Sequence, residues 1–141
     1  MNKWKDGIIS LNNNVIISPG YRFEDFKKTL YYNGQDGIKI IYLDSRVIID
    51  KHEYIISLFF RNSVLYMLSL ICCDIDFSIE QERERKKMHY EILQRYNIYQ
   101  DDIFDWGKVV SEYDAKGNVS SINFYYLTTV SVGQKSPSFV G

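Results

Sequence analysis

The sequence contains only two cysteines, Cys72 and Cys73, and they are adjacent. Neighbouring side chains on a strand point to opposite faces, so this pair can neither chelate a metal together nor form an unstrained disulfide. No Cys-x-x-Cys or His-x-x-x-His spacing accompanies the two histidines, His52 and His89. We therefore expect buried, reduced thiols and no metal or other cofactor.

Motifs for phosphate binding and for nucleophilic catalysis are also missing. The eight glycines are scattered singly, without G-x-G-x-x-G, G-x-x-x-x-G-K or G-x-S-x-G. The enzyme alternative that is left is a metal-free ribonuclease built on His52 and His89 with Lys51 or Glu53. It requires residues far apart in the sequence to converge, and His89 is more typical of a packed histidine at the edge of the core. We predict that the protein is not an enzyme.

We expect no secretory signal in the first six residues, because they lack an apolar segment and include Asp6. The protein should therefore stay in the cytoplasm. Residues 54–73 are apolar enough to raise the question of a membrane span, but Arg61 falls near the centre, where a charge is costly. We expect strands in this stretch and no contact with a membrane.

The apolar pattern predicts a single α+β domain over residues 1–127, with a largely antiparallel sheet, two main helices and terminal hairpins. At 141 residues and 16.7 kDa, a second core is not expected. From Thr128 onward the composition turns to Ser, Thr, Gly and Pro, which indicates a flexible tail over residues 128–141.

Four strands in a meander are predicted in the middle of the chain, because turn residues and charges interrupt it at hairpin spacing. The last of these strands is apolar on both faces and should be central in the sheet. The four predicted strands are Ile38–Leu43, Arg46–Asp50, Tyr54–Phe60 and Ser63–Cys73.

Hairpins and helices flank the meander. A helix with the apolar stripe Phe23, Phe26 and Leu30 follows the first hairpin. Ser78 and Gln81 form a capping box that should begin a second helix, which runs to about Tyr96. The predicted hairpin strands are Ile8–Leu11 with Val15–Ile17, and Lys108–Tyr113 with Val119–Leu127.

Charge is unevenly distributed although the net charge is only −1. Residues 74–114 hold eleven acids against six bases, and such a region can steer a basic partner, although a merely solvated helix and loop is the simpler alternative. Bases over residues 83–87 are interleaved with acids, so no clean basic stripe and no nucleic-acid binding are expected. The candidate partner-binding residues are Asp101, Asp102, Asp105, Glu112 and Asp114.

The order of elements from Trp4 to Tyr126 carries a resemblance. An opening hairpin and a short helix lead into an apolar meander, and a polar helix leads into a closing hairpin. The residues are Trp4 and Gly7, Ile17-Ser18-Pro19-Gly20, Phe23-Glu24-Asp25-Phe26, Trp106-Gly107, Tyr113-Asp114 with Gly117, and Ser121-Ile122 with Tyr125. In this order the chain resembles the small immunity proteins encoded beside bacterial polymorphic toxins of the contact-dependent inhibition and Rhs kinds.

The resemblance implies a non-enzymatic, cytoplasmic inhibitor that binds a cognate toxin domain, for instance a basic nuclease, and blocks its active site or substrate path. It carries over no individual functional residue. The alternative is a non-enzymatic binding module or homodimer that uses an apolar sheet face. On that hypothesis the side of the sheet around Tyr54, Ile56 and Leu58 is exposed and is buried by a second copy.

Overall fold

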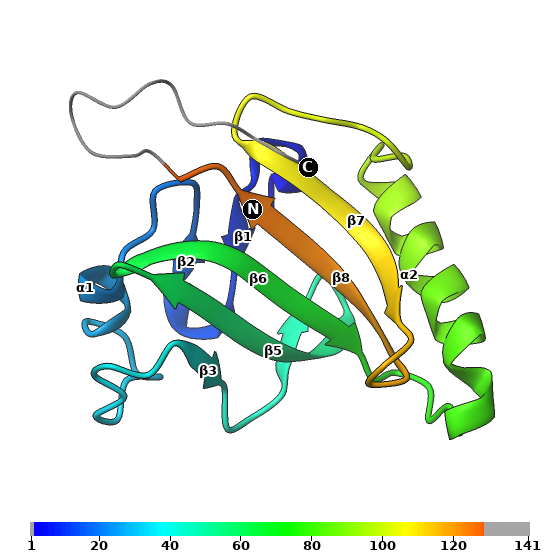
Figure 1. The fold of residues 1–141 in the computed structure, drawn as a ribbon, viewed down its shortest axis with the longest axis horizontal. Helices are drawn as coiled ribbons and strands as arrows, with labels where there is room; N and C mark the ends of the chain where they lie inside the picture. The colour runs from blue at the N-terminus through cyan, green and yellow to red at the C-terminus, as the bar shows by residue number, and fades with distance from the viewer. Residues whose placement is uncertain (1, 129–141) are drawn as a thin grey trace.

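A six-stranded antiparallel sheet forms the centre of the protein, for which the computed structural model describes residues 2–128 (Figure 1). Its strands follow the order β3-β5-β6-β8-β7, and β4 also pairs with β5. With a small β1-β2 sheet and two α-helices, the described residues form a single α+β domain, which confirms the predicted fold class. Apart from Thr128, the predicted flexible tail lies outside the described residues.

The elements come in the following order along the chain. They are β1 (Ile9–Ser10), β2 (Ile16–Ile17), α1 (Phe23–Phe26), β3 (Ile40–Tyr42), β4 (Val47–Ile49), β5 (His52–Arg61), β6 (Val64–Cys72), α2 (Glu82–Arg95), β7 (Gly107–Asp114) and β8 (Val119–Tyr126). Short 3-10 helices span Trp4–Asp6, Asn12–Asn14 and Ile79–Gln81. No helix in residues 2–128 is long and apolar enough to cross a bilayer.

The long hairpin of β5 and β6 confirms that residues 54–73 form strands. Its turn lies at Asn62 and Ser63, whose positive φ values of 52° and 64° suit a type I′ connection, one residue later than predicted. The register shifts between Phe59 and Phe60, so that Phe60 pairs with Leu65 and Phe59 with Met67. This bulge turns Leu65 toward the core. The strand β6 is central, as predicted.

The predicted meander is wrong at its start, because β3 and β4 do not pair with each other. Both pair with β5, β3 opposite residues 57–59 and β4 opposite residues 52–54. The ten-residue strand β5 spans roughly 33 Å, which leaves room for two three-residue strands end to end along one edge. Asp44 and Ser45 therefore connect two pieces of an edge and do not form a hairpin turn.

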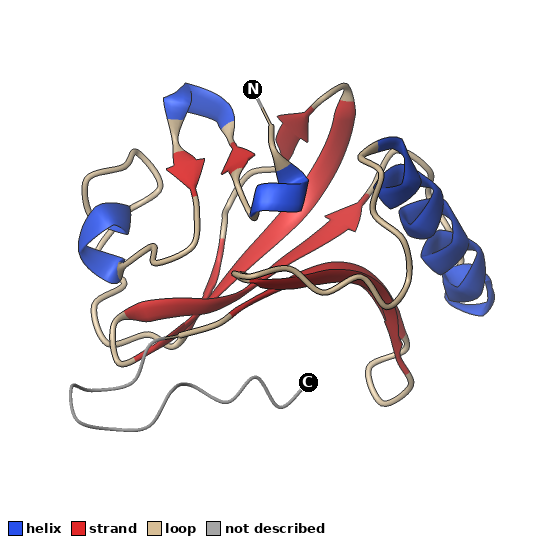
Figure 2. Cartoon of the chain, turned by 90° about the horizontal axis from the view of Figure 1, so that it is seen from above, coloured by secondary structure: helices blue, strands red, loops and turns tan. Residues whose placement is uncertain are grey.

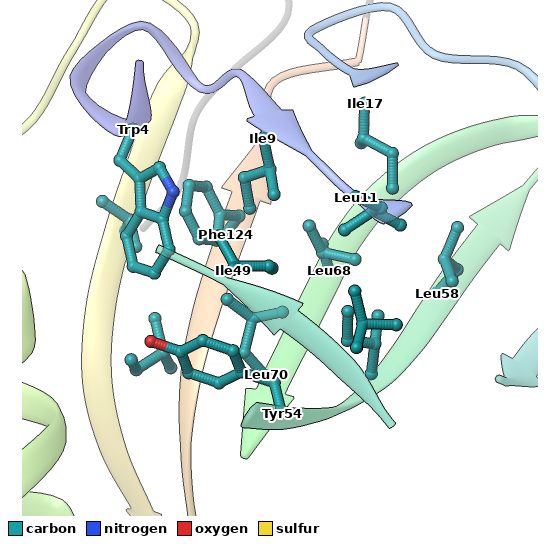
Figure 3. Packing of buried hydrophobic residues seen from close by; sticks show 14 of the residues in the cluster. Trp4, Ile9, Leu11, Ile17, Ile49, Tyr54, Leu58, Leu68, Leu70 and Phe124 are labelled. Carbon is teal, nitrogen blue, oxygen red and sulfur yellow. The ribbon is translucent and has the colours of Figure 1, made fainter. Parts of the chain in front are cut away.

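One face of the sheet carries the core (Figure 3). Trp4, Ile9 and Ile17 from the N-terminal segment lie over it, and each is 0% or 1% exposed. Figure 2 shows this segment and α1 over the same face, while α2 lies along the β7 side. On β8, Ile122 and Phe124 point into this core and are fully buried.

The prediction that Tyr54, Ile56 and Leu58 face outward is wrong. All three point into this core and are at most 1% exposed. The alternate residues of β5 form the outer face instead, including Ile55, which is 38% exposed. A period of two fixes which residues share a face but not which face is covered.

The first helix is shorter than its apolar pattern predicts. It ends at Phe26, and Leu30 is 81% exposed. The Thr29 hydroxyl donates to the Phe26 carbonyl at 2.8 Å, a local bond that offers the backbone an alternative to a continued helix. The second helix agrees with the prediction: the Ser78 amide donates to Gln81 Oε1 at 3.1 Å at its start, and it ends at Arg95.

Candidate functional site

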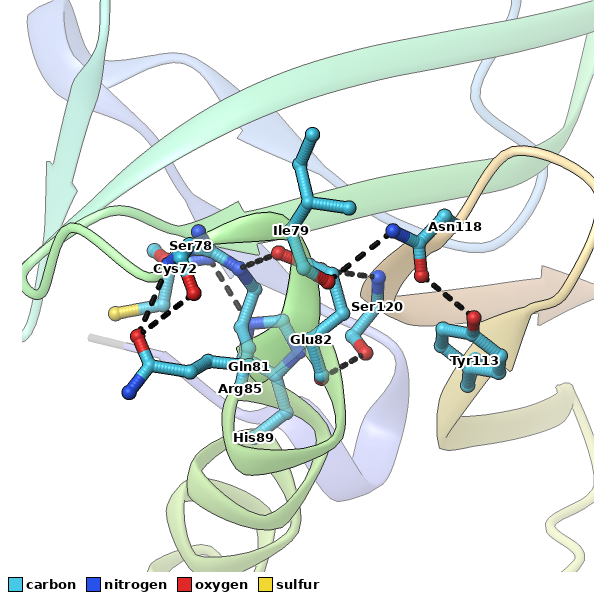
Figure 4. Close-up of polar contacts among 10 residues, drawn as sticks. All are labelled: Cys72, Ser78, Ile79, Gln81, Glu82, Arg85, His89, Tyr113, Asn118 and Ser120. Atoms are coloured by element: carbon cyan, nitrogen blue, oxygen red, sulfur yellow. Dashed lines mark hydrogen bonds and ion pairs between the residues drawn. The ribbon is translucent and has the colours of Figure 1, made fainter.

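The inner side of α2 carries a buried polar network that joins the helix to the ends of two strands (Figure 4). Glu82 Oε1 accepts from the Ser120 amide at 2.8 Å, and Glu82 Oε2 accepts from Arg85 Nε at 3.1 Å. The Arg85 guanidinium also donates to the Cys72 carbonyl. Because Glu82 and Arg85 are less than 10% exposed and satisfy each other, this network holds the helix in place and offers nothing to a ligand.

His89 belongs to the same network. Its Nε2 accepts from the Cys72 amide at 3.0 Å, and the side chain is 0% exposed. Burial, aided by the nearby Arg85 charge, lowers the pKa of His89 to about 3, so the imidazole is neutral at physiological pH. A general acid or base must reach its substrate. The structure therefore contradicts the alternative of a ribonuclease built on His52 and His89.

A second cluster brings His52, Cys72 and Asp74 together, with ligand atoms within 4.8 Å of one another. Such a set of side chains could hold a metal ion, but hydrogen bonds within the protein already occupy the imidazole nitrogens. Arg95 Nη1 donates to His52 Nε2 at 3.1 Å, which leaves Nδ1 as the protonated nitrogen, and Nδ1 donates to Asp74 at 2.5 Å. Both imidazole nitrogens are occupied and a guanidinium adjoins them, so these residues do not fit a metal.

Hydrogen bonds and burial also set the chemistry of the groups around Asp74. Partial burial raises the pKa of Asp74, but hydrogen bonds from the Glu53 amide and from His52 outweigh it and hold that pKa below its ordinary value. Burial raises the pKa of the Cys72 thiol to about 11, so Cys72 stays protonated and is a poor nucleophile. Cys72 is fully buried as predicted, whereas Cys73 is only half-buried.

A groove of about 800 Å³ lies between α2 and β7, and the loop that connects them contributes Tyr99 to Ile103. Buried Leu93 and Val109 give it an apolar floor. The Ser111 hydroxyl donates to the Lys86 carbonyl at 2.8 Å and ties helix to strand beside it. The volume of the groove falls within the range of about 300–1,000 Å³ that is common for ligand sites. We call this feature the α2–β7 groove.

The side of α2 that lines the α2–β7 groove is basic. Arg83, Lys86, Lys87 and Tyr90 all line it, at helical positions i, i+3, i+4 and i+7. The three bases are exposed, and none takes part in the ion pairs found within residues 2–128. The prediction that no basic stripe can form is therefore wrong, because acids that alternate with bases in the sequence lie on other sides of the helix.

The structure brings three of the five candidate acids to the groove, namely Asp101, Asp102 and Glu112. Asp101 is exposed, and Asp102 accepts from the Tyr99 amide at 2.7 Å. Glu112 accepts from Asn123 Nδ2 at 2.7 Å and from the Tyr125 hydroxyl at 2.5 Å. Two of the three are thus partly committed to hydrogen bonds within the domain.

The other two candidate acids lie outside the α2–β7 groove. Asp105 is exposed in the turn before β7, and Asp114 accepts from the Lys116 amide at 3.1 Å in the turn after it. Together with the bases of α2, this arrangement makes the groove surface mixed in charge and not acidic. A count of charges along the sequence could not find that mixture, but a helical count at every third and fourth residue would have found the basic face.

Trp106 anchors the loop beside the groove. Its indole Nε1 donates to the Lys5 carbonyl at 2.7 Å, and its ring stacks on Phe104. The ring also lies against Gly7, where a Cβ atom would come within 2.7 Å of it. Trp106 therefore stabilises the fold and fixes the loop that carries Asp101 and Asp102.

Comparisons with known proteins add no assignment to this geometry. A scan against protein-family models, a search of curated proteins and a search of solved structures each found no match to this chain.

Proposed function

We propose that this protein is a non-enzymatic, cytoplasmic inhibitor that binds a cognate toxin domain and blocks its active site or substrate path. The α2–β7 groove is its binding surface. The observation that carries the proposal is a groove lined by charges of both signs and by the aromatic rings of Tyr90, Tyr99 and Tyr113. Its bases on α2 take part in none of the ion pairs within residues 2–128. Tyrosine supplies contact area at low entropic cost, and complementary charge speeds encounter and fixes orientation.

The charges in the groove bear on the kind of toxin. Arg83, Lys86, Lys87 and Lys108 line the groove together with three acids. A uniformly basic nuclease surface would complement only the acids, so a toxin surface with charges of both signs fits better. The acids of the loop, Asp101 and Asp102, would meet the basic part of that surface.

Growth rescue tests the proposal. The proposal predicts a toxin gene beside this one, and the C-terminal domain of that toxin is expressed in bacteria with and without this protein. Rescue of growth and a stable complex of the two purified proteins are expected. If growth is not rescued and the purified proteins do not bind each other, the inhibitor function is wrong.

A homodimer is a second candidate, favoured by apolar side chains on the outer face near β3 and β4. They are Ile40, Tyr42, Ile48 and Ile55, which are 38%, 66%, 59% and 38% exposed. Together they offer a more apolar surface than isolated side chains would. Sedimentation equilibrium tests this candidate: a dimer that Ile48→Lys dissociates supports it, and a monomer at the highest soluble concentration contradicts it.

A further inference from the structure

The strand β7 has one free edge. It is the last strand of the sheet, and its only strand partner in the described residues is β8. Directly opposed residues of an antiparallel pair alternate between hydrogen-bonded and non-hydrogen-bonded pairs. The Leu127 amide donates to the Trp106 carbonyl at 2.8 Å, so Trp106 and Leu127 form a hydrogen-bonded pair. The next hydrogen-bonded pairs along β7 then lie at Lys108, Val110 and Glu112.

The main-chain groups of Val109, Ser111 and Tyr113 therefore point away from β8. Two contacts support this assignment of hydrogen-bonded and non-hydrogen-bonded pairs. Both main-chain groups of Gly107 bond to Phe104, at 2.8 and 3.1 Å, on the side away from β8. The Ser120 amide opposite Tyr113 is free to donate to Glu82. Within residues 2–128, no group outside the β7-β8 hairpin hydrogen-bonds the main chain of Val109, Ser111 or Tyr113.

The α2–β7 groove runs along this open edge. All six consecutive residues 108–113 line it, although alternate side chains point to opposite faces of the sheet. Only a groove along the edge of the strand can contact every one of them. Phe104 covers the edge at Gly107, so the open length is that of residues 109–113, roughly 16 Å at about 3.3 Å per residue.

The charge that α2 brings to the open edge is positive, whereas the acids of the groove lie on the loop and on β7. Arg83, Lys86 and Lys87 line the groove from α2, and the bond between Ser111 and the Lys86 carbonyl places this part of the helix next to the middle of the open edge. Exposed cations without an ion-pair partner in the described residues are complemented by carboxylates of a ligand. Backbone groups of an open edge are complemented by an extended chain.

We propose that an extended, acidic segment of a partner protein adds to the sheet as a strand beside β7, with its carboxylates facing Arg83, Lys86 and Lys87. This inference rests on the proposed function for the identity of the partner as a toxin domain. Strand addition supplies main-chain hydrogen bonds, and the bases of α2 select acidic side chains along the added strand. A nucleic acid would satisfy the cations but would leave the outward amides and carbonyls of β7 unpaired.

Capped synthetic peptides test the inference without the toxin. One six-residue peptide alternates valine with glutamate, and its matched control alternates valine with lysine; a short single-stranded RNA is the third probe. The glutamate peptide should perturb the backbone amide signals of Val109, Ser111 and Tyr113 in NMR spectra and slow their hydrogen exchange. Equal or tighter binding of the lysine peptide or of the RNA, or no binding of the glutamate peptide, overturns the proposal.

Two variants of one residue isolate the backbone contribution. Ser111→Pro removes an outward amide without removing a bond to β8, and proline is tolerated at such edge positions. Ser111→Ala keeps the amide and loses the same hydroxyl bond to Lys86. Peptide binding should weaken about tenfold or more in Ser111→Pro and less than about threefold in Ser111→Ala. Equal effects of the two variants would contradict strand addition, and circular dichroism checks that both are folded.

Charge reversal isolates the contribution of α2. The triple variant Arg83→Glu, Lys86→Glu, Lys87→Glu should abolish measurable binding of the glutamate peptide. The matched control, Lys5→Glu, Lys39→Glu, Lys51→Glu, changes net charge equally at exposed lysines outside the groove and should retain most of it. Equal losses in both triple variants would show a nonspecific charge effect and overturn the proposal.

The toxin assay separates this inference from the proposed function. If the toxin is neutralised equally by the wild type, by Ser111→Pro and by the groove triple variant, the inhibitor function holds and strand addition is wrong. If the glutamate peptide binds as expected but no toxin is neutralised, the groove is a strand-binding site and the inhibitor function is wrong. A dimer in sedimentation that Ser111→Pro abolishes would show that a second copy of this chain pairs with the edge, which contradicts the proposal of an acidic strand from a partner protein.

Discussion

The two sides of α2 have similar residue types and opposite roles. Toward the sheet, Glu82 and Arg85 are buried, bonded to each other and bonded to the main chain of β8 and β6. Toward the α2–β7 groove, Arg83 and Lys86 are exposed and take part in none of the ion pairs of residues 2–128. In the sequence these four residues fall within five positions of one another.

The comparison teaches that charge type does not indicate role. A buried ion pair is stable only where its hydrogen bonds offset the cost of removing both charges from water. Here the Ser120 amide donates to Glu82, and the Cys72 carbonyl accepts from Arg85. An exposed base has no such requirement and can meet a partner. Stability should therefore depend on the inner side of the helix and binding on the outer side.

The largest expected effect is on stability at the inner side. Arg85→Ala leaves Glu82 buried without its cation and should lower the free energy of unfolding by about 3–5 kcal/mol. Arg83→Ala, the matched change on the groove side, should alter it by less than about 0.5 kcal/mol. Urea unfolding measures both. Similar losses in the two variants would break the distinction between the two sides.

Replacing both buried charges sharpens the same point. In Glu82→Leu with Arg85→Met, neither partner is left unpaired, so the loss should be smaller than for Arg85→Ala alone, although the Ser120 amide loses its acceptor. Urea unfolding of the double variant checks this expectation. A loss equal to the sum of the single losses would show that the two charges act independently.

A smaller effect is expected from pH at His89. The pKa of His89 is about 3 in the folded protein, against 6.5 ordinarily. As the pH falls below about 6.5, His89 therefore binds a proton in the unfolded chain but stays neutral in the folded protein. The contribution of the neutral His89 to the free energy of unfolding is fully present above this pH. Between about pH 8 and about pH 5, His89 alone should lower the free energy of unfolding by about 2 kcal/mol.

His89→Gln removes this titration while it keeps a side-chain acceptor for the Cys72 amide. The stability difference between the wild type and this variant, measured by urea unfolding, should therefore shrink as pH falls. His52→Gln is the control, since His52 is partly exposed and lies outside the inner side of α2. A pH-independent difference for His89→Gln would argue against a buried, neutral imidazole.

The smallest effect is expected at two acids of the loop between α2 and β7. Asp101→Lys with Asp105→Lys should slow association with a verified cognate toxin by less than about tenfold and reduce its salt dependence, because the bases of the groove already offset part of the acidic field. Stopped-flow association at several salt concentrations measures this. Asp102 is left unchanged because its carboxylate accepts from the Tyr99 amide. An unchanged rate and salt dependence would remove these acids from the binding site.

Some elements of the fold can be predicted from the sequence and others cannot, for physical reasons. The hairpin of β7 and β8 and the start of α2 were predictable because alternation and a capping box act locally. The early end of α1 depends on a local bond of Thr29 that an apolar stripe cannot reveal. The joint pairing of β3 and β4 with β5 depends on the length of a strand that follows them in the sequence.

The candidate site was only partly predictable. Asp101, Asp102 and Glu112 were identified from the sequence and do line the α2–β7 groove. The basic face was missed because charges were compared along the chain and not around the helix. The open edge of β7 could not be inferred at all, since it depends on which strand is last in the sheet.

The sequence by itself determined the fold class, the position of the long hairpin and the capped start of α2, because these follow from periodicity and from contacts between near neighbours. Only the tertiary structure decided which side of β5 is covered, which charges of α2 are buried and which edge of the sheet stays open. A strand has two faces and a helix has several, and each acquires its role only when distant segments pack against it.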